Sequence, residues 1–121
     1  MSTFDALVRD AASYLEEHQC CSKHHVEHTG SNCYLLDFYS TLGEIEKGKE
    51  LIAYLFTLVT DTKGGKVFYP GHMNPMNMSQ NVIDTGACVD SISRFLHLHR
   101  SAFTSEEHVS YSACLREVAE T

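Results

Sequence analysis

The sequence predicts an all-α protein of about five helices that pair as antiparallel hairpins. Three observations favour this class. Apolar residues recur at helical spacing through most of the 121 residues, and only two prolines interrupt the chain. The third is a weak internal similarity among residues 13–15, 53–55 and 113–115. A unit of roughly 40 to 60 residues that recurs in this way is typical of stacked helical hairpins.

The first predicted helix begins near the N-terminus and ends near residues 18–21. Six apolar residues share one face of it, and we expect this face to be buried: Phe4, Leu7, Val8, Ala11, Tyr14 and Leu15. The polar segment 22–31 is expected to form a loop. Asn32 is expected to cap a second helix, which Gly43 ends. This helix should bury Cys33, Leu36 and Tyr39.

The third predicted helix spans residues 44–60. From Leu51 onward it is apolar on almost every side, so it must be covered on more than one face. Residues 61–80 differ from the rest of the chain, because their glycines and prolines prevent a helix. Within them, residues 66–69 suit a short strand. A segment of this length in a compact domain is more often functional than idle.

Two more helices are expected after this segment. The fourth runs from near Asn81 to about His99 and buries a stripe of Val82, Val89, Ile92 and Leu96, with Cys88 and Phe95 alongside. Thr104 and Glu107 have the spacing of a capping box at the start of the fifth. That helix should bury Val109, Tyr111, Leu115 and Val118, and its pattern reaches the last residue without a stop signal.

Charge and hydropathy exclude several classes of function. The formal net charge is -7 and no basic run occurs, which argues against binding nucleic acid or an anionic membrane surface. The longest apolar run, residues 51–59, is half the length of a membrane span, and we expect no signal peptide, because the first ten residues carry acids and no long apolar segment. We therefore expect a cytoplasmic protein whose five cysteines are thiols.

A glycine-rich turn with an aromatic residue, GGKVFYPG at 64–71, is followed after a short spacer by NVIDTGA at 81–87. This pattern resembles that of (α/α)-toroid proteins, which include carbohydrate-active hydrolases, lyases and epimerases and the terpenoid-cyclase-like toroids. In these proteins about six helical hairpins close into a ring. The resemblance is specific over about residues 50–100 and extends loosely over 1–121.

The resemblance implies a substrate cleft at the end of the ring where the inner helices begin. Asp84, Asn81 and the loop before them would face this cleft. Because five helices are too few to close a ring, we expect residues 1–121 to form a single all-α domain that is the N-terminal part of a longer toroid. A saccharide is the ligand that the resemblance implies, and we expect no cofactor.

Asp84 is the candidate catalytic residue, as a cleft carboxylate that binds sugar hydroxyls or acts as a general acid or base. The alternative is structural, because an acid in the first helical turn complements the helix dipole. A typical glycosidase needs a second carboxylate, and Asp90 lies nearly two turns further along.

Four other residues are candidates for saccharide binding. The ring of Tyr69 offers an apolar platform, and His72, Asn77 and Asn81 offer hydrogen-bonding groups. The alternative is a surface loop whose three methionines pack against their neighbours or fill a flexible apolar pocket.

Cysteine and histidine gather in one stretch of the chain: His18, Cys20, Cys21, His24, His25, His28 and Cys33. Both residue types bind zinc, but no C-x-x-C pair or finger-like spacing occurs, so we predict no metal site and keep a zinc-stabilised domain as the alternative. Cys88 lies close to Asp84 in the sequence, but within an apolar stripe, where burial makes a thiol inert as a nucleophile.

A second class of function stays open beside the carbohydrate-active one. The chain would then be a small helical interaction module without catalytic activity, which binds a protein partner or forms a homodimer through an exposed apolar face. The toroid interpretation predicts instead that a missing C-terminal segment covers the open faces.

Overall fold

The computed structural model describes residues 3–18, 29–62, 65–68 and 78–119. This part of the chain contains five α-helices, which confirms the predicted class, and a β-hairpin and a 3₁₀ turn are added to them. The elements follow in the order α1 (Thr3–His18), α2 (Thr29–Leu42), α3 (Ile45–Phe56), β1 (Val59–Thr62), β2 (Gly65–Phe68), α4 (Met78–Leu98), the 3₁₀ turn η2 (Arg100–Ala102) and α5 (Ser105–Ala119).

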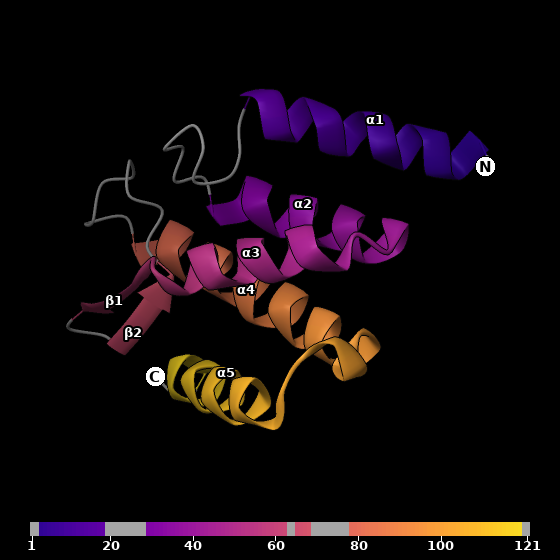
Figure 1. Cartoon of the computed structure of the whole chain (residues 1–121). Coiled ribbons are helices and arrows are strands. Elements are labelled where there is room, and N and C mark those ends of the chain that lie inside the picture. The colour runs from indigo at the N-terminus through magenta and orange to yellow at the C-terminus, as the bar shows by residue number, and fades with distance from the viewer. Residues whose placement is uncertain (1–2, 19–28, 63–64, 69–77, 120–121) are drawn as a thin grey trace.

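Helices α2 and α4 lie side by side and run in the same direction, while α1, α3 and α5 run the opposite way (Figure 1). Helix α2 packs most extensively against α4 and α1. Three side-chain contacts between α2 and α4 or the residue after α4 occur in the same order along both helices, as expected for parallel helices: Cys33–Cys88, Asp37–Arg94 and Ser40–His99. This α2–α4 seam is therefore the centre of the fold.

The core is built from α2, α3 and α4 and closed by the hairpin and α5. Its largest fully buried side chains include Leu35, Leu36, Ile52, Leu55, Phe68, Ile92 and Phe95. Phe103, next to η2, packs edge-on against Phe95 at 6.0 Å between ring centroids and against Tyr111 of α5 at 6.2 Å. These rings join the last helix to the core.

The apolar face predicted for α1 is only half buried, so that prediction was wrong in extent. Of the six predicted residues only Val8 is buried; Phe4 and Leu7 are each 63% exposed, Tyr14 is 55% exposed, and the buried Ala12 was not part of the predicted stripe. Only one edge of the stripe faces α2, because α1 lies at the side of the helical array (Figure 1). Periodicity identifies an apolar stripe but not how much of it a neighbour covers.

Two predicted helix starts and one predicted helix end also need correction. Helix α2 begins at Thr29, so Asn32 is not its N-cap but a fully buried residue inside the first turn. Helix α4 begins at Met78 and not near Asn81. Helix α3 ends at Phe56 instead of Thr60. The N–H groups of Thr57 and Leu58 donate to carbonyls three residues earlier, those of Tyr54 and Leu55, which forms a turn that ends the helix.

The residues after this turn form a two-stranded antiparallel sheet that pairs Val59 with Phe68 and Thr62 with Gly65. β-Branched residues favour strands over helices, which explains why β1 replaces the end of the predicted helix. A short strand was predicted at 66–69, and β2 confirms it with a shift of one residue.

The predicted stop and start signals around α2 and α5 are confirmed. Gly43 has φ 71° and ends α2 with two hydrogen bonds, from its own N–H to Ser40 O and from Glu44 N–H to Tyr39 O. In the capping box, Thr104 N–H donates to Glu107 Oε1 at 2.8 Å and Glu107 N–H donates to Thr104 Oγ1 at 3.0 Å. On α5, Leu115 and Val118 are buried as predicted, but Val109 is 71% exposed.

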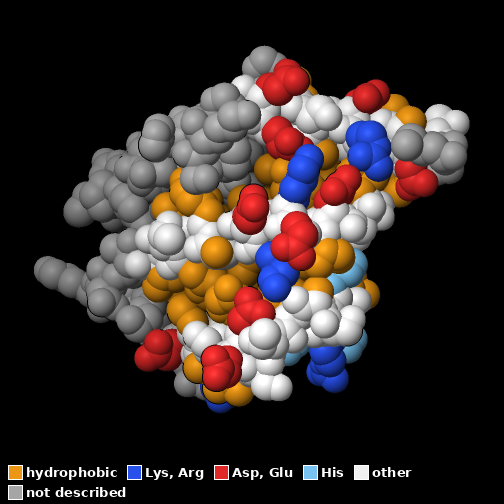
Figure 2. Space-filling view, in the orientation of Figure 1, with side chains coloured by type: hydrophobic (Ala, Val, Ile, Leu, Met, Phe, Trp, Pro, Cys, Tyr) orange, Lys and Arg blue, Asp and Glu red, His pale blue; other side chains and the backbone are white. Residues whose placement is uncertain are grey.

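On the face drawn in Figure 2, charges of both signs alternate over α1 and α3, and hydrophobic side chains gather between α3 and α5. Between these two helices, the rings of Phe56 on α3 and Tyr111 on α5 stack with their centroids 4.8 Å apart. No helix in the described ranges combines the length and the apolar character that crossing a membrane requires.

Candidate functional site

The predicted saccharide site falls at the edge of what the structure describes. Tyr69, His72 and Asn77 lie outside the described residues, so their placement as binding residues stays a prediction. Asn81 and Asp84 belong to α4 as its fourth and seventh residues. Asp84 therefore lies in the second turn and not the first, which weakens the dipole explanation for this carboxylate.

The end of β2 is attached to α4 by a buried side chain and a hydrogen bond. Phe68, the last residue of β2, is fully buried, and its backbone N–H donates to Oγ1 of Thr85 at 3.1 Å. The Phe68 ring also packs on Phe56, with 5.8 Å between centroids. Because Thr85 directly follows Asp84, the end of β2 is fixed beside the α4 turn that carries the candidate catalytic residue.

The first turns of α2 and α4 lie at the same end of the molecule, because the two helices are parallel and adjacent (Figure 1). Both helices therefore begin at the same end of the α2–α4 seam, α2 after residue 28 and α4 after residue 77.

Most of the histidine and cysteine cluster lies outside the described residues, and the zinc alternative is not tested there. Cys33 is described and is buried in α2 next to Cys88. Within the described ranges, no three His, Cys, Asp or Glu side chains are grouped as a metal site would require.

At the opposite end of the seam, Ser40 and His99 form a polar pair that the sequence analysis did not identify. Oγ of Ser40 and Nε2 of His99 are 2.9 Å apart, and the His99 ring packs on Phe95 at 4.6 Å between centroids. Such a pair has the atoms of a nucleophile and its base. It lies where two helices end, and exposed carbonyls there stabilise a cation rather than an oxyanion, so we assign it a structural role.

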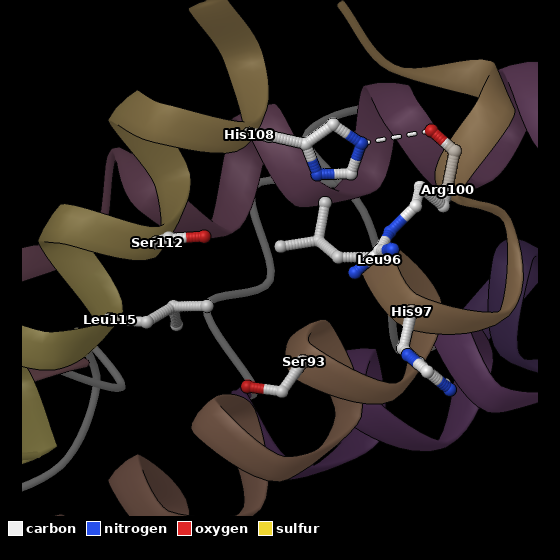
Figure 3. Close-up of a pocket in the computed structure, with 7 residues that line it drawn as sticks. All are labelled: Ser93, Leu96, His97, Arg100, His108, Ser112 and Leu115. Carbon is white, nitrogen blue, oxygen red and sulfur yellow. Dashed lines mark hydrogen bonds between the residues drawn. The ribbon is translucent and has the colours of Figure 1, made fainter. Parts of the chain in front are cut away.

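An open groove of about 250 Å³ lies between the second half of α4 and α5 (Figure 3). Two leucines form its apolar part, and none of its seven lining residues is acidic: Ser93, Leu96, His97, Arg100, His108, Ser112 and Leu115. Nε2 of His108 lies 2.8 Å from the Arg100 carbonyl oxygen and donates to it. The hydroxyl, imidazole and guanidinium groups suit a small anion better than a cation, although water screens such exposed charges.

Each wall of this groove has a signal in the sequence. Ser93 and His97 are four residues apart on α4, and His108 and Ser112 are four apart on α5, so each pair shares a helix face. Helical spacing alone does not predict that these two faces pack against each other; this follows from the tertiary structure.

Comparisons of the chain with protein-family models, with curated proteins and with solved structures found no match in any of the three.

Proposed function

We propose that the chain is part of an (α/α)-toroid and contributes one wall of a saccharide-binding cleft. The observation that carries this proposal is the direction of the helices. Parallel α2 and α4 are adjacent, and α1, α3 and α5 run against them, as inner and outer helices alternate in such a ring. In this interpretation α2 and α4 are the inner helices and the cleft lies at their N-terminal ends.

Asp84 and Asn81 are the α4 residues proposed to face this cleft. Helical spacing puts positions 81 and 84 on the same side of α4 as Thr85 and Cys88. Cys88 contacts α2, so this side of α4 is turned toward the α2 seam. A carboxylate and an amide near the start of the seam suit the hydroxyl groups of a sugar, and Tyr69, His72 and Asn77 would complete the site from the preceding segment.

Saccharide binding by matched variants tests this proposal. A panel of neutral and uronate oligosaccharides is titrated by NMR into the wild-type chain and into Asp84→Ala and Asp10→Ala. Asp10 is an exposed acid on α1, so it controls for the lost negative charge. We expect binding at roughly millimolar to micromolar Kd that Asp84→Ala weakens at least tenfold and Asp10→Ala leaves unchanged.

Two results would contradict the proposal at different points. Equal binding by a folded Asp84→Ala chain removes Asp84 from the site. Absence of binding to every saccharide in the panel, with the chain folded by circular dichroism, overturns the cleft itself.

Self-association through α1 is a second candidate function. Phe4 and Leu7 are each 63% exposed and continue the stripe whose other edge packs on α2. In a dimer with a two-fold axis, this exposed edge of one copy would pack against the same edge of the other copy. Most small homodimers have such a self-complementary interface. Light scattering should then give a dimer that Leu7→Glu converts to a monomer, and a monomeric wild type would exclude this function.

A further inference from the structure

Two cysteine side chains meet in the middle of the α2–α4 seam. Cys33 is 3% exposed and Cys88 is fully buried, and Sγ of Cys33 donates to Sγ of Cys88 across 3.2 Å. The two residues are 55 positions apart in the sequence and come from different helices. Neither residue is in a disulfide in this structure, so both side chains are reduced thiols.

The geometry is close to that of a disulfide. The two sulfurs of a disulfide are about 2.05 Å apart. Because Sγ of Cys33 and Sγ of Cys88 are 3.2 Å apart, they must approach by only about 1.2 Å to form one. Small rotations of the two side chains supply such a shift, because the helices that carry them are already packed together. Distant cysteines are brought this close only by the tertiary fold.

We infer that Cys33 and Cys88 are an oxidisable dithiol that forms a disulfide between α2 and α4. This inference is independent of the saccharide proposal. The oxidant is a small disulfide such as glutathione disulfide. The Cys33 thiolate attacks one oxidant sulfur, which forms a mixed disulfide and releases one thiol.

The Cys88 thiolate then attacks Sγ of Cys33, forms the Cys33–Cys88 bond and releases the second thiol. The protein loses two protons and two electrons, and the oxidant gains them as its two sulfurs leave as thiols. The bond would link the two central helices covalently. It would also close a loop between cysteines that are 55 positions apart in the sequence, and a loop of this length strongly reduces the conformational freedom of the unfolded chain. Because both thiols are buried, oxidation of the folded chain requires transient opening of the seam.

The test measures where the disulfide forms and whether folding favours it. The reduced chain is refolded from urea in glutathione buffers of several ratios, alkylated and mapped by mass spectrometry without reduction. We expect Cys33 and Cys88 to be linked, and the oxidation equilibrium to favour this link at least about tenfold more in native buffer than in concentrated urea. The Tm of the oxidised chain should exceed that of the reduced chain by about 5 to 15 °C.

Three further variants separate this pair from the other thiols. A chain with Cys20→Ser, Cys21→Ser and Cys114→Ser should keep the oxidation equilibrium and the Tm shift of the wild type. Cys88→Ala should lose the linkage and the Tm shift, and the control Cys114→Ala should keep them. Mapping of the wild-type chain decides the question even if Cys88→Ala does not fold. An oxidation equilibrium that is equal in buffer and urea, linkage to other cysteines, or refolded chains that carry only separate glutathione adducts would each overturn the inference.

Discussion

At the scale of single residues, the contact between Gly48 and Phe95 sets how closely α3 approaches α4. Gly48 is buried, and a Cβ placed on it would overlap the Phe95 ring. The ring has little room to move, because it also packs on His99 and Phe103. A glycine inside a helix is therefore retained here for packing, despite its cost in conformational entropy.

We expect Gly48→Ala to lower the free energy of unfolding by about 1 to 3 kcal/mol, which is typical of overpacking in a core. Gly86 is the matched control, because it lies inside α4 and no atom of the described residues comes within 4 Å of an added Cβ. Gly86→Ala should be neutral or stabilising by up to about 1 kcal/mol, since alanine favours a helix. Urea unfolding measures both values, and equal effects of the two substitutions would contradict the close approach.

At the scale of elements, Lys49 joins α3 to the last part of the chain. Its ammonium group donates to the carbonyl of Ala102 at 2.9 Å, lies 3.6 Å from the Glu107 carboxylate and stands over the Phe103 ring at 5.2 Å. Three partners, from η2, from the residue that follows it and from α5, thus meet at one partly buried side chain.

We predict that Lys49→Met lowers the free energy of unfolding by about 1 to 2 kcal/mol, because the part-buried Ala102 carbonyl loses a hydrogen bond and the buried Phe103 ring loses a cation–π contact. Arg9→Met is the comparison. Arg9 is largely exposed and pairs with Glu44 at 3.4 Å, so its loss should cost no more than about 0.5 kcal/mol. The prediction fails if thermal or urea unfolding ranks the two variants in the opposite order.

The capping box of α5 makes a pH-dependent contribution to stability. The pKa of Glu107 is lowered, mainly because the backbone N–H of Thr104 donates to its carboxylate. The ionised form therefore stabilises the folded state. This contribution is complete above the pKa of the unfolded chain's glutamate and is lost as the pH falls through the lower, folded-state pKa.

Glu107→Gln keeps an acceptor for the Thr104 N–H but removes the charge. The difference in stability between wild type and this variant should shrink as the pH is lowered from 7 to about 3. Thr104→Ala should cost about 1 kcal/mol at neutral pH, whereas Ser105→Ala, one residue into the helix, should cost little. A wild-type advantage over Glu107→Gln that is independent of pH would show that the charge is not involved.

At the scale of the whole molecule, the α2–α4 seam should be the most protected part. Leu35, Leu36 and Ile92 are fully buried there, while one side of α1 faces solvent. We expect backbone amides of α2 and α4 to exchange hydrogen only on global unfolding, and those of α1 to exchange through local opening. Hydrogen-exchange NMR checks this order, and equal protection of α1 and α4 would contradict it.

The helices and their local signals were predictable from the sequence to different degrees. The stop at Gly43 and the box of Thr104 and Glu107 were predicted correctly, because each depends on residues within one turn. The start of α2 at Thr29 was not, because the polar Asn32 is buried by tertiary contacts instead of capping the helix.

The candidate site divides in the same way. Asn81 and Asp84 could be placed on α4 from the sequence, and their environment together with Tyr69, His72 and Asn77 stays a prediction. The hydrogen bond from Phe68 to Thr85 and the pair of Ser40 and His99 carried no sequence signal, since each joins residues from separate elements.

By itself the sequence determined the helical class, the approximate number of helices, the end of α2 at Gly43 and the start of α5 at its capping box, because periodicity and capping act over a few residues. Only the tertiary structure decided that α2 and α4 are parallel neighbours, that Cys33 meets Cys88, and that half of the α1 stripe is left uncovered. The physical reason is that burial depends on which surfaces meet across long separations in the chain, and a stripe of apolar residues is compatible with many partners.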